Sequence, residues 1–360
     1  MASALQVATL PVFNIYSMSS KYASSYHFRG NYLSGDSLTM PRPPAFIHVD
    51  MDGLWAVRRC YGRPVRDTFR NDPVWEQGAP EFQRFFADHS VPASFFLVGA
   101  DMKVPIKRRL AHQLAEAGHE IANHSWEHRI GRTQMGTGGI RHHIERGHEA
   151  LVRAGLPAPV GFRSPGYDVD IRVIRVLRRL GYAYDASLLP TRLQPLLRLA
   201  DAWLARRWQR GKKQFGRMAY ALAPRVPYCP SKNRLRIPAP IVRPDFIEFP
   251  VTTLPPLNLP LTASGIFASG PEKTIRALRR PELQGKPLLF LLHGIDLTDC
   301  TRPIVFDSRR PRIGGFHRSA ASKRRDLETV LRFVAENYEI VLTRDWATRA
   351  LAPEPGVPDS

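Results

Sequence analysis

Two histidines separated by three residues, His124 and His128, form the pattern with the clearest chemical meaning in this sequence. On one turn of helix their imidazoles would project in the same direction and could bind one metal ion together. The alternative is a pair of exposed helix histidines with no ligand. The apolar run EIAN directly precedes His124 and is typical of a strand end, where barrel enzymes carry catalytic residues, which favours the metal site.

Asp50 and Asp52 directly follow the apolar run FIHV and place two carboxylates at the end of a second expected strand. Neighbouring carboxylates repel each other unless a cation or hydrogen bonds offset their charge. We expect their side chains to point in different directions, so that one could bind a metal while the other faces a substrate. In the alternative interpretation they are ordinary turn or helix-cap residues.

Two further expected strand ends carry side chains that could take part in binding or catalysis. Arg163 precedes a Pro-Gly turn in GFRSPGY (161–167), and this turn could present backbone N–H groups to a ligand. His293 ends the most apolar run of the chain, although a lone histidine in such a place is usually structural. Four strand ends of this kind together predict a functional site more strongly than any one of them alone.

The elements that must position these residues alternate between short apolar runs and amphipathic helical patterns. The expected strands are 45–49, 94–99, 120–124, 161–164, 182–186, 247–251, 287–293 and 339–343, and the clearest helices are 104–118, 171–181 and 322–338. Strand–helix alternation predicts a parallel α/β sheet. Seven or eight strands in roughly 300 residues favour its closure into a (β/α) barrel, with the active site at the carboxyl ends of the strands.

The composition points to an anionic partner. The 360 residues include 52 Lys and Arg against 32 Asp and Glu, a net charge of +20, which suits nucleic acid, a phosphorylated substrate or an acidic membrane surface. We expect no nucleic acid partner, because the basic residues concentrate in one segment and the sequence has no RNP, zinc-finger or helix-turn-helix signature. Three cysteines without C-x-x-C spacing argue against a disulfide framework and are typical of a reducing compartment.

The basic residues gather in an insertion, 191–243, which carries 13 Lys and Arg but one acid and so accounts for +12 of the net charge. Its first half places Leu and Trp at three- to four-residue spacing among arginines, which predicts a basic amphipathic helix. Its second half is rich in Pro and Arg and is expected to be a loop. The insertion is either a solvated surface excursion or a lid that faces an anionic membrane.

The order of these motifs resembles that of the polysaccharide deacetylases of the NodB-homology type, carbohydrate esterase family 4, over roughly residues 45–350. The matching motifs are Asp50 and Asp52, HSWEH (124–128), RSPGY (163–167), YDASL (184–188) in the fourth place, and LLHGID (291–296). The Asp-x-Asp spacing and the phrase FPVTTLP (249–255) look more like the branches acting on lipid-linked sugars or peptidoglycan than like the chitin enzymes, and the phrase is also similar to one in aminoarabinose-lipid deformylases.

The resemblance implies a distorted (β/α) barrel and a divalent metal, usually Zn²⁺, with Co²⁺, Ni²⁺ or Mn²⁺ as alternatives. Asp52, His124 and His128 would hold the metal and leave a position open for water. The ion would lower the pKa of that water and polarise the substrate carbonyl. Asp50 would act as the general base, and Arg163 would orient it and keep it ionised.

The same resemblance assigns the remaining roles. Tyr167, with Pro165 in the same turn, would contact the substrate and donate a backbone N–H to the oxyanion. His293 would protonate the leaving amine. The fourth motif departs from the family's usual D-x-x-D-W, so the residue that orients His293 is open; Asp185 is the first choice and Asp296 the second.

The sequence therefore predicts a metal-dependent hydrolase that removes an acetyl or formyl group from an amino sugar on a lipid-linked or cell-envelope glycan. The alternatives are a deacetylase of soluble chitin-like or peptidoglycan oligosaccharides and a non-catalytic glycan-binding member. We expect a domain over 44–350, a loose tail over 1–43 with Met40 as an alternative start, and a tail over 351–360. The expected location is the cytoplasm or the inner face of the membrane, because no signal peptide is evident and no apolar run approaches the roughly 20 residues of a membrane span.

Overall fold

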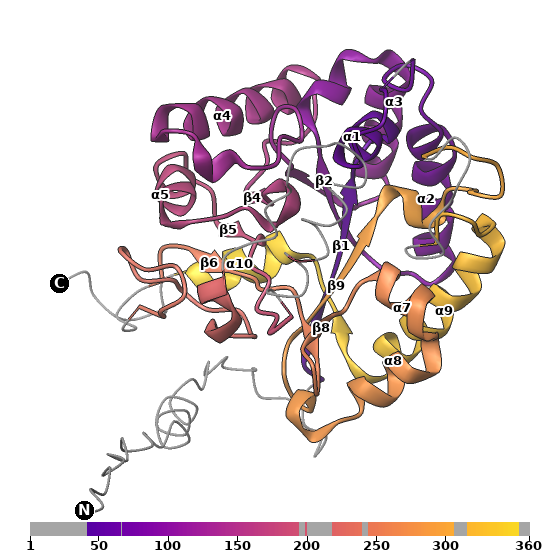
Figure 1. The fold of residues 1–360 in the computed structure, drawn as a ribbon. Helices are drawn as coiled ribbons and strands as arrows, with labels where there is room; N and C mark the ends of the chain where they lie inside the picture. The colour runs from indigo at the N-terminus through magenta and orange to yellow at the C-terminus, as the bar shows by residue number, and fades with distance from the viewer. Residues whose placement is uncertain are drawn as a thin grey trace, which may run out of the picture. The chain divides into compact units, whose positions relative to one another are not determined.

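A parallel β-sheet forms the centre of the unit that spans residues 42–360, and helices cover it (Figure 1). The computed structural model describes residues 42–65, 67–193, 199, 218–239, 244–305 and 315–352. The sheet has the order β10-β1-β2-β3-β4-β5-β6, β9 also pairs with β1, and every one of these pairs is parallel. Its strands are β1 (Pro44–Met51), β2 (Ser94–Leu97), β3 (Glu120–Asn123), β4 (Gly161–Phe162), β5 (Tyr184–Asp185), β6 (Ile247–Glu248), β9 (Leu288–His293) and β10 (Glu339–Ile340).

Strand β1 is the central strand because three others pair with it. Ala45 is in register with both β9 and β10, so these two lie on opposite sides of β1, and His48 is in register with both β2 and β9. Strands β2 and β10 therefore share one side of β1. Seven of its eight residues are buried, as expected for a strand covered on both faces by the rest of the fold.

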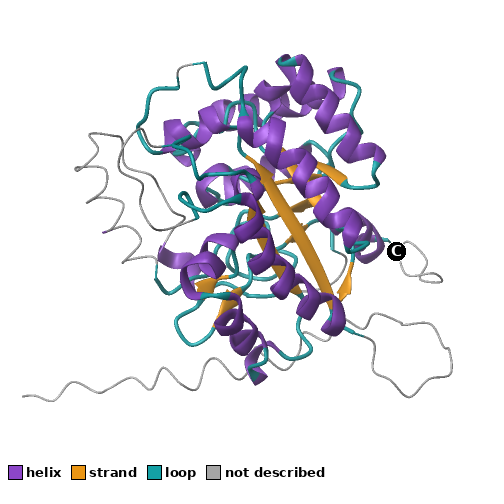
Figure 2. Cartoon of the chain, turned by 90° about the vertical axis from the view of Figure 1, so that its right-hand side faces the viewer, coloured by secondary structure: helices purple, strands orange, loops and turns teal. Residues whose placement is uncertain are grey.

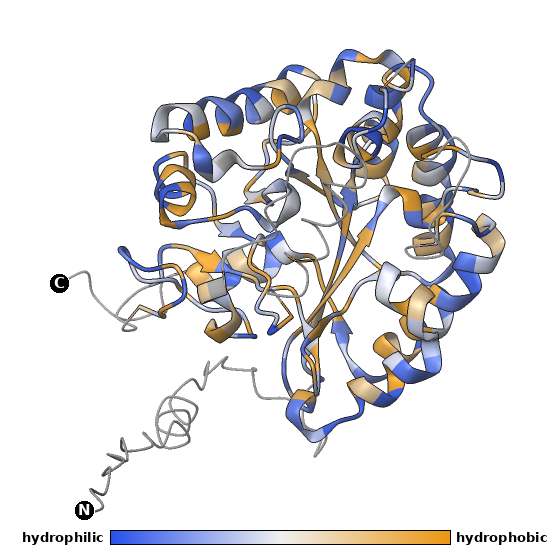
Figure 3. Ribbon diagram, in the orientation of Figure 1, coloured by the Kyte–Doolittle hydropathy of each residue, from blue (hydrophilic) through white to orange (hydrophobic). Residues whose placement is uncertain are grey.

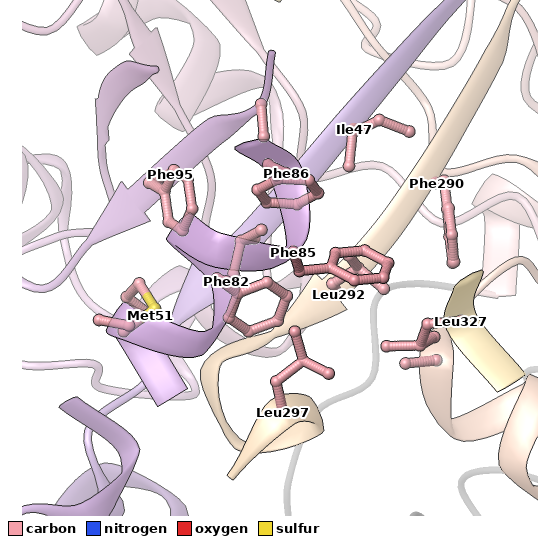
Figure 4. Close-up of a cluster of buried hydrophobic side chains, with 14 of the residues drawn as sticks. Ile47, Met51, Phe82, Phe85, Phe86, Phe95, Phe290, Leu292, Leu297 and Leu327 are labelled. Atoms are coloured by element: carbon pink, nitrogen blue, oxygen red, sulfur yellow. The ribbon is translucent and has the colours of Figure 1, made fainter. Parts of the chain in front are cut away.

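Alternate residues of β1 serve two different cores. Ile47 and Met51 point into the cluster beneath the outer helices, where they meet Phe82 and Phe95 (Figure 4). The residues between them in sequence point to the enclosed side of the sheet, where Phe46 joins a second cluster with Phe96 of β2, Tyr184 of β5 and Phe249 directly after β6. Because the side-chain period of a strand is two, His48 and Asp50 lie on this enclosed side with Phe46.

Helices follow most of the strands and surround the sheet (Figure 2). They carry hydrophilic and hydrophobic residues in alternation, as helices packed on a core do (Figure 3). The predicted helices correspond to α3 (Pro105–Glu116), α5 (Ile171–Arg179) and α9 (Ala320–Asn337). The others are α1 (Leu54–Cys60), α2 (Ala79–Asp88), α4 (Thr137–Arg153), α7 (Ala263–Ser269), α8 (Pro271–Leu278) and α10 (Thr343–Leu351).

The barrel is distorted because β6 and β9 do not pair directly. Between them, the N–H of Leu291 donates to the carbonyl of Leu261 at 3.2 Å, and the N–H of Leu289 donates to the hydroxyl of Thr252 at 2.7 Å. A short antiparallel hairpin, β7 (Thr253–Leu254) and β8 (Leu259–Pro260), connects these two contact points. The predicted distorted (β/α) barrel is confirmed, and all eight expected strands are present.

The insertion 191–243 is described only in part, and the expected amphipathic helix in its first half lies outside the described residues, as does most of the expected N-terminal tail. In the second half, Tyr220 and Leu235 pack into the core beside α5, and Tyr228 forms an antiparallel bridge with Glu248 of β6. This half is therefore attached to the barrel. Among the helices of the described segments, none combines the length and apolarity needed to cross a membrane.

A buried ion cluster anchors the segment that follows β1. The ammonium of Lys107 in α3 lies 2.6 Å from Asp72 and 2.7 Å from Asp101, and all three side chains are fully buried. Asp72 also accepts the N–H of Leu54, the first residue of α1, at 3.0 Å. Burial raises the pKa of Asp72 to about 6 and also raises that of Asp101, so the ionised carboxylates depend on the charge of Lys107.

We expect Lys107→Met to lower the free energy of unfolding by about 3–5 kcal/mol, because it leaves two buried carboxylates without their cation. Urea denaturation of the full chain at neutral pH measures the change. The control is Lys273→Met on the exposed surface of α8, where we expect a change within about 0.5 kcal/mol. Equal stability of the two variants would contradict this interpretation of the cluster.

Candidate metal centre

Three side chains predicted to bind a metal meet at the end of β1. Oδ1 of Asp52 lies 3.3 Å from Nε2 of His124 and 3.0 Å from Nε2 of His128. The three ligand atoms are all within 4.8 Å of one another, and all three residues are buried. Asp52 directly follows β1 and His124 directly follows β3, so the parallel sheet brings them to the same edge.

The predicted helical turn at 124–128 is wrong, because this segment is an irregular loop. Ser125 and His128 have φ values of 69° and 48°, in the left-handed region, which turn the chain back on itself. The N–H of Ser125 donates to the side chain of Asn123 at 2.8 Å, and the N–H of Trp126 donates to the carbonyl of His143 in α4 at 3.1 Å. The two imidazoles therefore converge through tertiary contacts of the loop and not through helical periodicity.

The donor set fits a divalent cation. Nδ1 of His124 lies 2.8 Å from the carbonyl oxygen of Arg163, which can only accept, so Nδ1 carries the proton and the lone pair of Nε2 faces Asp52. Oδ1 of Asp52 is buried, and apart from the two imidazoles no described residue offers it a hydrogen-bond donor. A lone pair and a carboxylate that face each other in a buried site repel unless positive charge lies between them.

The electrostatics of His128 lead to the same conclusion. Burial alone would lower the pKa of His128, but the charge of Asp52 and the nearby thiol of Cys60 raise it to about 10. Burial alone would raise the pKa of Asp52, but His128 and His124 hold it well below its usual value. The site therefore favours positive charge, and two imidazoles with one carboxylate form a set that suits Zn²⁺ and related ions.

Asp50 and Asp52 have different partners, as expected for two roles. Oδ1 of Asp50 lies 3.6 Å from Nη1 of the fully buried Arg163, while Asp52 faces the imidazoles. Asp50 is also in direct register with His293 on the neighbouring strand β9. The structure thus brings the expected base, its arginine and the expected acid to the same strand ends as the expected metal ligands.

Pro165 and Tyr167 form a 3-10 turn, η5 (Pro165–Tyr167), directly after Arg163. The N–H of Tyr167, expected to contact an oxyanion, donates to the carbonyl of Ser164 at a long 3.3 Å, so this weak bond must open if the N–H is to bind a substrate. Burial and the carboxylates of Asp50 and Asp52 raise the pKa of the Tyr167 hydroxyl, which stays protonated and can donate a hydrogen bond.

The structure corrects the choice of the residue beside His293. Oδ2 of Asp296 lies 3.8 Å from Nδ1 of His293 and accepts the backbone N–H of the same residue at 2.7 Å. Burial would lower the pKa of His293, but Asp296, together with the charges of Asp50 and Asp52, raises it to about 9. Asp296, the second choice from the sequence, is therefore the carboxylate beside this imidazole.

Asp185, the first choice, stabilises the turn that carries Arg163. Asp185 accepts the hydroxyl of Ser187 at 2.6 Å, and that hydroxyl oxygen accepts the N–H of Ser164 at 2.7 Å. Burial and the adjacent Asp185 raise the pKa of Glu248 well above its usual value, so we assign the proton of this pair to Glu248. The sequence offered no signal for Glu248, which lies in an apolar run that reads as an ordinary buried strand.

Comparisons with known proteins bear on the family and the fold of this chain. Residues 63–184 match the family model of polysaccharide deacetylases. This range of the chain contains His124, His128 and Arg163, and Asp50 and Asp52 lie before it. A crystal structure described as a polysaccharide deacetylase from Mycobacterium smegmatis aligns with a TM-score of 0.51 and 16% identity, covering 91% of this chain and 98% of that one. The crystal structure of Puue allantoinase aligns with a TM-score of 0.51 and 12% identity, covering 89% and 96%. At these identities the two structures establish the fold alone. No curated protein matches the sequence.

Fold and site together define a (β/α)-barrel domain with a candidate two-histidine, one-carboxylate centre at its strand ends. Residues 63–184 of this domain match the polysaccharide deacetylase family, the family that the order of the motifs resembles.

We expect His128→Ala to weaken Zn²⁺ binding by more than about 100-fold, because it removes one ligand, whereas Asp50→Asn should keep the affinity within about tenfold. Competition with a chelator, followed by metal analysis of the full chain, measures both. The control is His142→Ala on the exposed side of α4, which should bind as the unmodified chain does. Loss of metal from Asp50→Asn equal to that from His128→Ala would contradict the division of roles.

Proposed function

We propose that this protein is a metal-dependent hydrolase that removes an N-acyl group, acetyl or formyl, from an amino sugar. The observation that carries the proposal is the convergence of Asp52, His124 and His128 on one point beside Asp50 and His293. Hydrolysis of an amide needs a polarised carbonyl, an activated water and a proton for the departing amine. This set of side chains offers a group for each requirement.

A divalent cation held by Asp52, His124 and His128 would supply Lewis acidity to the carbonyl and to the attacking water. Asp50 removes the proton from that water as the general base. Arg163, whose guanidinium lies 3.6 Å from Asp50, orients the carboxylate toward the site.

His293 then protonates the nitrogen of the amide, which otherwise leaves as a very poor anion. Its raised pKa of about 9 keeps the imidazolium populated at neutral pH, and Asp296 favours that charged form. Tyr167 donates to the developing oxyanion from its backbone N–H once the long bond to Ser164 opens.

We expect Asp50→Asn and His293→Ala each to lower kcat by about 10²–10⁴-fold, because each removes a proton-transfer group. Release of primary amine from N-acetylated and N-formylated amino sugars, with Zn²⁺ supplied, measures the loss. Allantoin is a comparison substrate, because one structural neighbour is an allantoinase. Turnover of allantoin without turnover of the sugars would redirect the proposal to ureides, and tight metal binding with no amine release would favour a non-catalytic glycan-binding protein.

We further propose that the sugar is carried on an anionic lipid and is reached from the cytoplasmic leaflet. The support is the +12 charge of the insertion 191–243 together with its Leu and Trp residues at three- to four-residue spacing. In the described part of the insertion, Leu222 is 76% exposed, an arrangement that suits partial burial in a lipid surface. Mass spectrometry of lipid-linked saccharides from cells with and without the gene would identify the acyl group by its mass.

The full chain should therefore co-sediment with vesicles that contain anionic lipid and much less with neutral vesicles, since each basic residue near the surface contributes about 1 kcal/mol. Deletion of residues 196–215 should abolish the difference. The control is amine release from a soluble substrate, which the deletion should leave intact. Equal binding to both kinds of vesicle, or undiminished binding after the deletion, would remove the lipid-linked substrate from the proposal.

A further inference from the structure

The guanidinium of Arg163 is a buried cation with few hydrogen bonds. The residue is fully buried, and neither Nε nor Nη1 has a hydrogen-bond partner among the described residues. Its contact with Asp50 at 3.6 Å is an ion pair beyond hydrogen-bond length, and its planar group lies 4.7 Å from the ring centre of Phe96. A buried cation this poorly bonded needs some other group to fix its position.

His48 of β1 is that group. Nη2 of Arg163 forms a short hydrogen bond with Nδ1 of His48. His48 is fully buried two positions before Asp50, so both side chains lie on the enclosed side of the sheet, with Arg163 contacting each of them.

The protonation of His48 follows from its partners. A guanidinium can only donate, so Nδ1 of His48 accepts and the proton of the neutral ring lies on Nε2. Nε2 then donates to the hydroxyl of Thr343, the first residue of α10, at 2.6 Å. Burial and the charge of Arg163 lower the pKa of His48 well below its usual value, which agrees with a neutral ring.

We propose that His48 is a positioning residue for amide hydrolysis: its Nδ1 holds the guanidinium of Arg163 against Asp50, and Thr343 fixes the imidazole from the other side. His48 does not touch the substrate and acts through Arg163. The proposal rests on the proposed hydrolase function, because Arg163 is assigned to the general base of that reaction.

The kinetic test compares His48→Leu with His48→Asn. Leucine has a similar size but no acceptor, whereas the asparagine oxygen can occupy the place of Nδ1. We expect His48→Leu to lower kcat about 10–100-fold through misplacement of Arg163, with KM within about twofold and the Zn²⁺ content unchanged. His48→Asn should restore most of the loss.

The matched control is His119→Leu. His119 is also buried, and its Nδ1 also accepts a hydrogen bond, from the N–H of Ala93 at 3.3 Å, but it lies in the outer core away from Arg163. This variant should lose stability without a change in kcat. Normal kcat in His48→Leu, or equal loss in the Leu and Asn variants, would overturn the proposal.

A second measurement requires neither an activity assay nor a variant. Nitrogen-15 NMR of histidine in the unmodified chain at neutral pH should show His48 as a neutral ring protonated at Nε2. A proton on Nδ1, or an imidazolium, would overturn the link to Arg163. Absence of hydrolysis with the expected tautomer present would instead count against the proposed function and leave the contact intact.

Discussion

Concentrated negative charge at the carboxyl ends of the strands is the constraint on which the rest of this structure depends. Asp50, Asp52 and Asp296 all act on the hydroxyl of Tyr167, and a second buried pair, Asp185 and Glu248, lies within reach of Arg163. Carboxylates removed from water repel one another strongly, so each must find a cation, a proton or a hydrogen-bond donor. The side chains around them supply these in different forms.

Each form of compensation corresponds to a different part of the proposed chemistry. Arg163 gives a permanent charge beside Asp50, and the proton assigned to Glu248 reduces the negative charge of the Asp185–Glu248 pair. The imidazoles of His124 and His128 face Asp52, and in the proposed mechanism a divalent ion held by the three would compensate its charge. The same electrostatic requirement thus connects the stability of the fold with the proposed metal site.

The fold meets this requirement through residues some distance from the centre. Lys107 and its two aspartates fix the start of α1 directly after Asp52, and Ser187 holds the turn that follows Arg163. His48 connects that arginine to α10. Strands β1, β4 and β5 therefore position the site through buried polar contacts between strand ends.

By itself, the sequence determined the strand–helix alternation, all eight strands of the sheet and the strand ends at which Asp50, Asp52, His124, Arg163 and His293 lie. These follow from local patterns, because burial of a parallel strand on both faces requires a continuous apolar run and its end is marked by the first polar residues. The family resemblance rested on the same local motifs.

Only the tertiary structure decided which side chains face one another. The loop at 124–128 forms through contacts with α4 that no helical period predicts, and Asp296 replaces Asp185 beside His293 because the strand order separates Asp185 from β9. In the sequence, His48 is a single polar residue within an apolar run, and no pattern marks it as functional. Its role depends on Arg163, 115 positions away, since hydrogen bonds between strands are fixed by packing and register, not by spacing along the chain.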